Sequence, residues 1–131
     1  MCKKIILNIL LTTIILSLAG CDTGAAYDNF ARCITSKNAK MYGTHWCTAC
    51  AGQKREFGSS FQHINYVECD PNGENSKADL CLKKGIKSYP TWEFSDGSRR
   101  EGVLPLEELA KITNCELKPD APQASGPLTL K

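Results

Sequence analysis

The sequence has little net charge, only one apolar run and no internal repeat, and these features exclude several classes of protein. It holds sixteen basic and fourteen acidic residues, and because Lys3 and Lys4 lie in the N-terminal segment, the rest of the chain carries equal numbers of both signs. Such a neutral chain gives no indication of nucleic acid or another polyanion as a partner. With 131 residues, 42% of them apolar, the chain has room for one small domain and not for two.

The apolar run extends from Ile5 to Leu18, directly after Lys3 and Lys4. Polar residues interrupt it, it is short for a membrane span, and no charged anchor follows it. This pattern, which ends in small residues, predicts an export signal over residues 1–20. An uncleaved N-terminal anchor is the alternative interpretation of the same run.

The signal ends in Leu18-Ala19-Gly20-Cys21, which resembles the lipobox of bacterial lipoproteins. The resemblance implies a bacterial source and cleavage before Cys21, whose sulfur then carries acyl chains such as palmitate. Two or three chains hold a soluble domain on a membrane far better than one chain does. We therefore expect a lipid anchor on Cys21, a short linker over residues 21–26, and a location on the extracytoplasmic, periplasmic side of a bacterial membrane.

Cysteine is the residue type that the chain has in excess, with eight in all. Cys2 lies in the signal and Cys21 is the expected lipid attachment site, so six remain for the folded domain. An even number in a small exported domain predicts paired cysteines, because an oxidising compartment permits disulfides and a small core gains stability from them. The six are Cys33, Cys47, Cys50, Cys69, Cys81 and Cys115.

Apolar periodicity and turn residues predict alternating helices and strands. Helices are expected over 27–36, 47–58, 76–85 and 106–113, and strands over 39–43, 64–69, 92–94 and a segment ending near Val103. The last helix is amphipathic, with its apolar face formed by Leu106, Leu109, Ala110 and Ile112. A parallel first half followed by an antiparallel hairpin predicts an α/β sandwich over residues 27–115, with a central mixed sheet of about four strands flanked by helices.

The composition changes after Cys115, where Pro119, Pro122 and Pro127 stand among Ala, Ser and Gly. Such a segment cannot bury enough apolar surface to order itself. The folded domain is therefore expected to end at Cys115, with a disordered tail over residues 116–131.

The segment Cys47-Thr48-Ala49-Cys50 stands where a predicted strand gives way to a predicted helix. Unpaired N–H groups and the helix dipole at this position stabilise a thiolate on Cys47. Cys50 falls one turn further on the same face, close enough to bond to Cys47 and less open to solvent. The spacing predicts a redox pair, with Cys47 as the attacking sulfur and Cys50 as the resolving one.

Two other kinds of site share the Cys-x-x-Cys spacing. Haem attachment needs histidine directly after the second cysteine, and Ala51 stands there. Zinc needs a second close pair of cysteines, whereas Cys69 and Cys81 are far apart in the chain. His63 is interpreted as a surface residue and not as a ligand. We therefore expect no metal and no cofactor.

About forty residues after the pair, Tyr89-Pro90-Thr91 leads into a predicted strand. Together with the cysteine pair, this segment resembles the thioredoxin superfamily, in which a cis-proline loop lies against the redox pair and receives the substrate chain in the mixed disulfide. The resemblance implies that Trp46, Tyr89, Pro90 and Thr91 contact the substrate. Without the cysteine pair, Pro90 would be interpreted as an ordinary proline that opens an edge strand.

A narrower resemblance covers roughly Phe30 to Cys115. The chain is similar there to the thioredoxin-like domain associated with bacterial vitamin K epoxide reductase homologues, through Lys40-Met41-Tyr42-Gly43, Trp46-Cys47, the segments 65–70 and 85–92, and Glu101-Gly102-Val103. In that family the domain passes oxidising equivalents between a quinone-coupled membrane enzyme and secreted substrates. The resemblance implies a partner of that kind and a structural disulfide between Cys69 and Cys81. Cys33 and Cys115 then remain as the last pair.

The chain departs from these families in two places. The usual Cys-Pro-His-Cys is replaced by Cys-Thr-Ala-Cys, which lacks the histidine that favours the thiolate, so the redox potential and the direction of electron flow stay open. His45 is a candidate for the missing positive charge, with a solvated loop residue as the alternative. In thioredoxin a buried acid serves as a proton acceptor. Met41 stands at the matching position of this sequence, so that role is either unfilled or taken by Glu68.

The resulting hypothesis is a monomeric, membrane-anchored thiol:disulfide oxidoreductase that exchanges disulfides with exported proteins, in the oxidative direction. The same residues would serve a reductive lipoprotein of the cytochrome maturation type if the partner were a reductant. A third alternative is a non-catalytic lipoprotein in which three structural disulfides support a binding surface. Burial of the Cys47/Cys50 pair would favour that third alternative.

Overall fold

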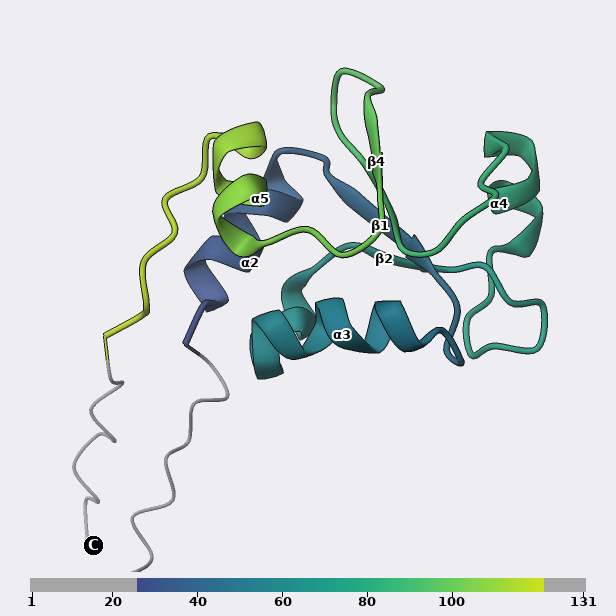
Figure 1. The fold of residues 1–131 in the computed structure, drawn as a ribbon, viewed down its shortest axis with the longest axis horizontal. Coiled ribbons are helices and arrows are strands. Elements are labelled where there is room, and N and C mark those ends of the chain that lie inside the picture. The colour runs from purple at the N-terminus through teal and green to yellow at the C-terminus, as the bar shows by residue number, and fades with distance from the viewer. Residues whose placement is uncertain (1–25, 122–131) are drawn as a thin grey trace, which may run out of the picture.

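The computed structural model describes residues 26–121 of the chain. The expected signal, the expected lipid attachment site at Cys21 and most of the Pro-rich tail lie outside the described residues (Figure 1). Between residues 26 and 121, no helix combines the length and the apolar character that crossing a bilayer requires.

The described chain forms one mixed sheet with helices around it (Figure 1). The strands lie in the order β2 (Tyr66–Glu68), β1 (Lys40–Gly43), β3 (Thr91–Glu93) and β4 (Arg99–Glu101). β1 pairs in parallel with β2 and antiparallel with β3, which pairs antiparallel with β4. The helices are α2 (Asp28–Ser36), α3 (Thr48–Phe57), α4 (Ala78–Lys84) and α5 (Leu106–Thr113). The expected α/β sandwich with a four-stranded mixed sheet flanked by helices is confirmed.

A 3₁₀ segment, η2 (Gly58–His63), follows α3 and was absent from the sequence prediction. It shortens the strand expected over 64–69, because the Ile64 N–H donates to the Phe61 carbonyl and the Tyr66 N–H donates to the Ile64 carbonyl. β2 therefore begins only at Tyr66. Helix ends were easier to predict, since Gly85 takes the left-handed conformation that ends α4.

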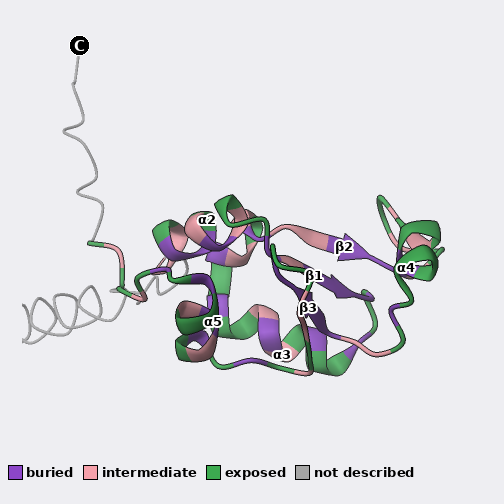
Figure 2. Cartoon of the chain, turned by 90° about the horizontal axis from the view of Figure 1, so that it is seen from above, coloured by how far each residue is buried: buried purple, intermediate pink, exposed green. Residues whose placement is uncertain are grey.

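Apolar side chains pack on both faces of the sheet, because successive residues of a strand point to opposite faces. Met41 belongs to the larger cluster, with Phe30, Phe57, Trp92 and Leu109 from α2, α3, β3 and α5. Tyr42, the next residue, belongs to a smaller cluster that includes Val67 and Ile86 and the disulfide near α4. In Figure 2 the strands β1, β2 and β3 are mostly purple, which marks buried residues.

The expected apolar face of α5 is correct for Leu106 and Leu109, which are buried, but wrong for Ile112, which is 36% exposed. The buried stripe continues instead through Thr113, one turn after Leu109. The Thr113 hydroxyl is accommodated there because it donates to the Leu109 carbonyl at 2.6 Å.

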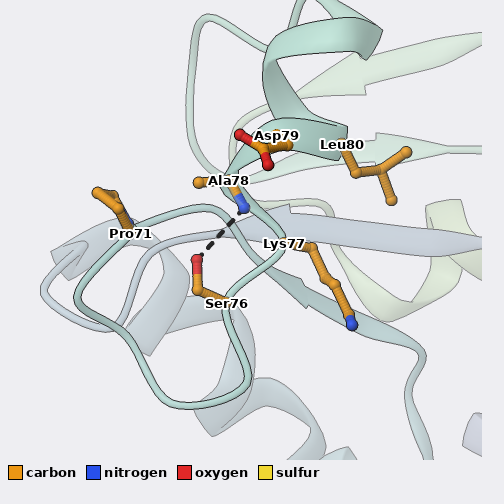
Figure 3. A pocket seen from close by; sticks show the side chains of 6 residues that line it. All are labelled: Pro71, Ser76, Lys77, Ala78, Asp79 and Leu80. Carbon is orange, nitrogen blue, oxygen red and sulfur yellow. Dashed lines mark hydrogen bonds between the residues drawn. The ribbon is translucent and has the colours of Figure 1, made fainter.

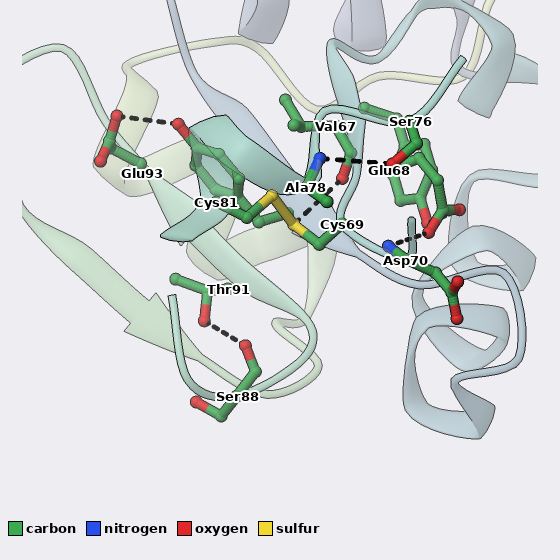
Figure 4. Close-up of a disulfide and its surroundings, with 12 residues drawn as sticks. Val67, Glu68, Cys69, Asp70, Ser76, Ala78, Cys81, Ser88, Thr91 and Glu93 are labelled. Atoms are coloured by element: carbon green, nitrogen blue, oxygen red, sulfur yellow. Dashed lines mark hydrogen bonds between the residues drawn. A yellow bond between two sulfur atoms is a disulfide. The ribbon is translucent and has the colours of Figure 1, made fainter. Parts of the chain in front are cut away.

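Two disulfides join elements that are distant in the chain. Cys33 of α2 is bonded to Cys115 just after α5, with 5.9 Å between the Cα atoms. Cys69, which follows β2, is bonded to Cys81 of α4, with 5.7 Å between the Cα atoms (Figure 4). The structure thus contains both pairs that were expected to be structural.

The segment after Cys115, where the disordered tail was expected to begin, still forms hydrogen bonds with the folded domain. The Asp120 carboxylate accepts from the Asn29 backbone N–H at 3.1 Å and from the Asn29 side-chain amide at 2.6 Å. The Asp120 N–H donates to the Ala26 carbonyl at 2.7 Å. Residues 116–120 therefore lie against the start of α2.

Loop length predicts that the two disulfides contribute unequally to stability. Cys33 and Cys115 are 82 positions apart, and Cys69 and Cys81 are 12 apart. In the chain-entropy model the longer loop contributes about 4.5 kcal/mol and the shorter one about 3 kcal/mol. Urea unfolding of the Cys33→Ala/Cys115→Ala and Cys69→Ala/Cys81→Ala double variants should show the larger loss for the first. The opposite order would contradict this account.

Candidate active site

Cys47 is the N-cap of α3, at the point where the chain turns from β1 into the helix. Its backbone is extended, with φ −73° and ψ 114°, and its Sγ accepts from the Cys50 backbone N–H at 3.1 Å. A sulfur in this position faces unpaired helix N–H groups and the positive end of the helix dipole. Cys47 therefore stands at the helix start that the sequence predicted.

Cys50 lies one turn further along α3 and is enclosed, with 1% of its surface exposed against 8% for Cys47. Burial, together with the hydrogen bond to Cys47, raises the pKa of the Cys50 thiol to about 12. Cys50 therefore holds its proton at neutral pH. Both thiols are free, whereas the other four cysteines among residues 26–121 form disulfides. Because Cys69 and Cys81 are bonded to each other, they are not available as zinc ligands beside this pair.

The loop before β3 lies directly against the dithiol. The Tyr89–Pro90 peptide bond is cis, and the Cys47 Sγ donates to the Tyr89 carbonyl at 3.6 Å. Thr91 and Pro90 hold the loop in place, because the Thr91 hydroxyl donates to the Ser88 carbonyl at 2.7 Å and the Pro90 carbonyl accepts from the Gly102 N–H at 2.8 Å. The structure therefore brings together the cysteine pair and the three residues of the predicted substrate loop.

Trp46, the fourth residue predicted to contact substrate, is 62% exposed beside Cys47. Its ring meets the Tyr89 ring edge-on, with 6.5 Å between the centroids. Its indole N–H donates to the Asp70 carboxylate in the loop after β2. Backbone and side-chain hydrogen bonds from Asn72 and Trp46 hold the pKa of Asp70 below its usual value, so the acceptor stays charged. Trp46 and Tyr89 thus form an aromatic surface next to the attacking sulfur.

The two residues predicted to tune the dithiol occupy different surroundings. His45 is exposed, and its charge lowers the pKa of Asp70. Glu68 is 6% exposed at the end of β2, where one carboxylate oxygen accepts from the Tyr66 hydroxyl at 3.0 Å and the other from the Asp70 N–H at 2.9 Å. Met41 is fully buried in the larger apolar cluster.

Sequence reasoning missed Gln53, which is fully buried. Its side-chain carbonyl accepts from the Leu104 N–H at 2.8 Å and from the Trp92 indole at 3.2 Å, and its amide donates to the Leu104 carbonyl at 3.0 Å. Gln53 thereby joins α3 to the segment after β4. A signal for it existed, because Gln53 is three residues after Cys50 and falls on the same helix face.

A surface hollow lies at the start of α4, lined by residues of the segment 71–80 (Figure 3). Within it the Ser76 hydroxyl accepts from the Ala78 N–H at 3.2 Å. The helix expected over 76–85 begins later than predicted, because Lys77 is the N-cap and α4 begins at Ala78. None of the residues that line this hollow belongs to the dithiol site.

No family model matches the chain. The chain is 37% identical over 91 residues to thiol-disulfide oxidoreductase LTO1 of Arabidopsis thaliana, a match that covers 66% of this chain and 24% of that protein. It is 28% identical over 75 residues to mycoredoxin 1 of Corynebacterium glutamicum, covering 57% of this chain and 92% of that protein. Thioredoxin O2 of Arabidopsis thaliana, solved in its oxidised state, aligns with a TM-score of 0.35 and 13% identity, over 69% of this chain and 88% of that one.

The described residues form an α/β sandwich with a Cys-x-x-Cys dithiol at a helix N-terminus and a cis-proline loop against it. Over part of its length the chain is similar to an Arabidopsis thiol-disulfide oxidoreductase and to mycoredoxin 1. The chain spans about a quarter of the length of the Arabidopsis relative and most of the length of mycoredoxin 1.

Burial of Cys50 predicts an unusual pH dependence of its reactivity. In a Cys47→Ser variant, Cys50 is the remaining free thiol between residues 26 and 121, and burial, the largest cause of its raised pKa, persists. Because a raised pKa keeps the thiol protonated, alkylation by iodoacetamide should be slow at pH 8 and still rising at pH 10. Mass spectrometry measures the rate, with the thiol of glutathione as reference. A rate that reaches its plateau below pH 9 would contradict the account.

Proposed function

We propose that this protein is a membrane-anchored, extracytoplasmic thiol:disulfide oxidoreductase that exchanges disulfides with exported proteins through Cys47 and Cys50. The observation that carries the proposal is the contact between the Cys47 Sγ and the Tyr89 carbonyl, which joins the helix N-terminus to the cis-proline loop. A substrate sulfur that reaches Cys47 meets a polypeptide backbone in the same place.

The exchange follows from the unequal positions of the two thiols. The Cys47 thiolate attacks one sulfur of a substrate disulfide, so a Cys47–substrate bond forms and the other substrate sulfur leaves as a thiolate. Cys50 then attacks the Cys47 sulfur, the pair becomes oxidised and the substrate is fully reduced. In the oxidative direction the same steps run in reverse, and Cys50 is the sulfur that leaves.

Substrate binding involves the residues around Cys47 that stay accessible. Trp46 and Tyr89 offer aromatic surface, which packs against side chains of any sequence, and the Tyr89–Pro90–Thr91 backbone lies alongside the attacking sulfur. These contacts select for an extended chain near a disulfide and for little else. That suits an enzyme with many exported proteins as substrates.

The two structural disulfides support the proposed compartment. Disulfides persist in oxidising compartments outside the cytoplasm, so a domain that holds two of them suits the extracytoplasmic side of a membrane. The lipobox-like sequence at Cys21 supplies the anchor in this proposal.

We propose the oxidative direction, with a quinone-linked membrane enzyme of the vitamin K epoxide reductase type as the partner that re-oxidises the pair. The support is the sequence resemblance to domains associated with such enzymes. A reductive role is favoured by a different observation: Thr48 and Ala49 are exposed and uncharged, so neither stabilises the thiolate form that makes such a pair oxidising. The redox potential decides between the two directions.

The non-catalytic alternative draws on the burial of the pair. Both cysteines are buried, with 8% of Cys47 and 1% of Cys50 exposed, and this burial favours the non-catalytic alternative. The exchange proposal is supported instead by the exposed neighbours of Cys47, Trp46 and Thr48, which offer accessible surface beside its sulfur. Thiol reactivity confined to Cys47 therefore separates the proposal from that alternative.

The proposal predicts that the two cysteines behave differently when replaced. With a peptide disulfide as substrate, the Cys50→Ser variant should accumulate a mixed disulfide that dithiothreitol releases, because nothing resolves it. The Cys47→Ser variant should accumulate none, because its remaining thiol is enclosed. Non-reducing gels and intact mass measure both. Equal trapping by both variants, or trapping by neither, would refute the assignment.

Lipid attachment can be tested separately from the dithiol exchange. Intact mass of the protein extracted from membranes should show added acyl chains on Cys21, and a Cys21→Ser variant should move to the soluble fraction while keeping its exchange activity. An unmodified Cys21 in the membrane fraction would remove the anchor from the proposal and leave the dithiol chemistry intact.

A further inference from the structure

The loop Tyr89–Pro90–Thr91 needs an attachment to the helix that carries the dithiol, because a substrate chain bound to the loop must reach Cys47. The Cys47 Sγ donates to the Tyr89 carbonyl at 3.6 Å. This contact is lost during exchange, since the sulfur carries no hydrogen once it is a thiolate or part of a mixed disulfide. Another group must therefore hold the loop beside α3 during the reaction.

Gln53 of α3 is the side chain that forms this attachment. It is fully buried and lies on the same helix face as Cys50, about one turn further along α3. Between residues 26 and 121, the other hydrogen bonds that join α3 to the chain after Ser88 all end on the Gln53 amide. The described directional contacts between the helix and the loop side of the sheet thus depend on this one residue.

The Gln53 amide reaches Pro90 from both sides of the loop. In β3, two residues after Pro90, the Trp92 indole donates to the Gln53 Oε1 at 3.2 Å. On the other side, the Leu104 N–H donates to the same oxygen at 2.8 Å and the Leu104 carbonyl accepts from the Gln53 Nε2 at 3.0 Å. Two residues before Leu104, the Gly102 N–H donates to the Pro90 carbonyl at 2.8 Å. Both connections therefore end at the cis-proline.

Apolar packing does not replace these bonds. The Phe57 and Trp92 rings lie 6.3 Å apart between their centroids, but such contacts tolerate small shifts, because the hydrophobic effect has no direction. Hydrogen bonds depend on distance and angle and so fix a position. Without Gln53, buried groups of Trp92 and Leu104 lose their partners, and the segment that holds Pro90 shifts to find others.

We propose that Gln53 is a positioning residue, which holds the cis-proline loop at the distance from Cys47 at which a polypeptide binds. This role rests on the dithiol exchange proposed above and adds no step to it. Gln53 touches neither sulfur and acts through Leu104 and Trp92. Its effect is selectivity: a polypeptide disulfide, whose backbone binds the loop, gains from it, whereas a small disulfide without a backbone does not.

The test compares two disulfides on the same protein. Reduced protein, with Cys33–Cys115 and Cys69–Cys81 intact, is mixed either with the disulfide-linked dimer of a short linear peptide or with bis(2-hydroxyethyl) disulfide. Acid quenching and intact mass give the rate at which the reduced form disappears. The selectivity ratio is the peptide rate divided by the small-disulfide rate. It is measured for variants whose circular dichroism matches the parent.

The variants are Gln53→Met, which keeps the length of the side chain and removes its hydrogen bonds, and Gln53→Glu. Ile34→Ala is the matched control, because Ile34 is also fully buried but lies in α2 and forms none of these bonds. The selectivity ratio should fall about tenfold or more in Gln53→Met, since a misplacement of about 1 Å costs about 10²-fold. The small-disulfide rate and the ratio of Ile34→Ala should match the parent.

Gln53→Glu gives a readout that loss of stability alone does not produce. A protonated carboxyl both donates and accepts, so it can form all three bonds, whereas a carboxylate cannot donate to the Leu104 carbonyl. Because burial raises the pKa of a carboxyl, the protonated form persists toward neutral pH. Relative to the parent at each pH, the ratio should be normal in acid and fall as the pH rises. Gln53→Met should show the same loss at every pH.

Three results would overturn or limit the account in distinguishable ways. Selectivity ratios within about twofold of the parent in both Gln53 variants would show that Gln53 does not position the loop, while the proposed function stands. An equal loss in Ile34→Ala would overturn the inference as well, because it would assign the effect to general destabilisation. Failure of the parent to react with either disulfide would overturn the dithiol exchange and the role of Gln53 with it.

Discussion

The end of β1 at Gly43 positions the groups around the dithiol. β1 is bordered by β2 on one side and β3 on the other, so its last residues meet Glu68 across one ladder and Thr91 across the other. The chain then turns directly into α3, which begins with Cys47 at its N-cap. Because three strands and one helix meet at this point, the Tyr89–Pro90 loop lies against Cys47, and Glu68 is buried at the end of the neighbouring strand.

The difference between the two thiols follows from one turn of helix. At the N-cap, Cys47 faces unpaired N–H groups and has 8% of its surface exposed, whereas three residues later Cys50 has 1% exposed. This burial keeps Cys50 protonated at neutral pH.

Much of this arrangement could be predicted from the sequence, because it is local. The Cys-x-x-Cys spacing, the helix start at Cys47, the helix end at Gly85 and the proline before β3 are each signalled within a few residues. The α/β sandwich follows from the order of these elements. The pairing of Cys69 with Cys81 came from family resemblance, and nothing in the spacing alone required it.

The rest depends on contacts between distant residues, for which a single sequence has no signal. The bond between Trp46 and Asp70 joins two loops, and the three hydrogen bonds of Gln53 reach the segment after β4. The 3₁₀ segment has no periodic apolar pattern that would predict it. The start of β2 was therefore predicted two residues before its observed start at Tyr66. Glu68 was a candidate by its type, but its hydrogen bonds to the Tyr66 hydroxyl and the Asp70 N–H are seen only in the structure.

The central claim is that Cys47 and Cys50 form a reversible redox couple while the other two pairs are structural. Equilibration of the folded protein with glutathione buffers of increasing ratio, followed by alkylation and intact mass, tests it most directly. The account predicts a single two-electron transition that adds two alkyl groups, on Cys47 and Cys50, with Cys33–Cys115 and Cys69–Cys81 still bonded, at a potential that gives the direction of exchange. It would be contradicted if the pair stayed unreactive across the series, or if all three pairs were reduced together.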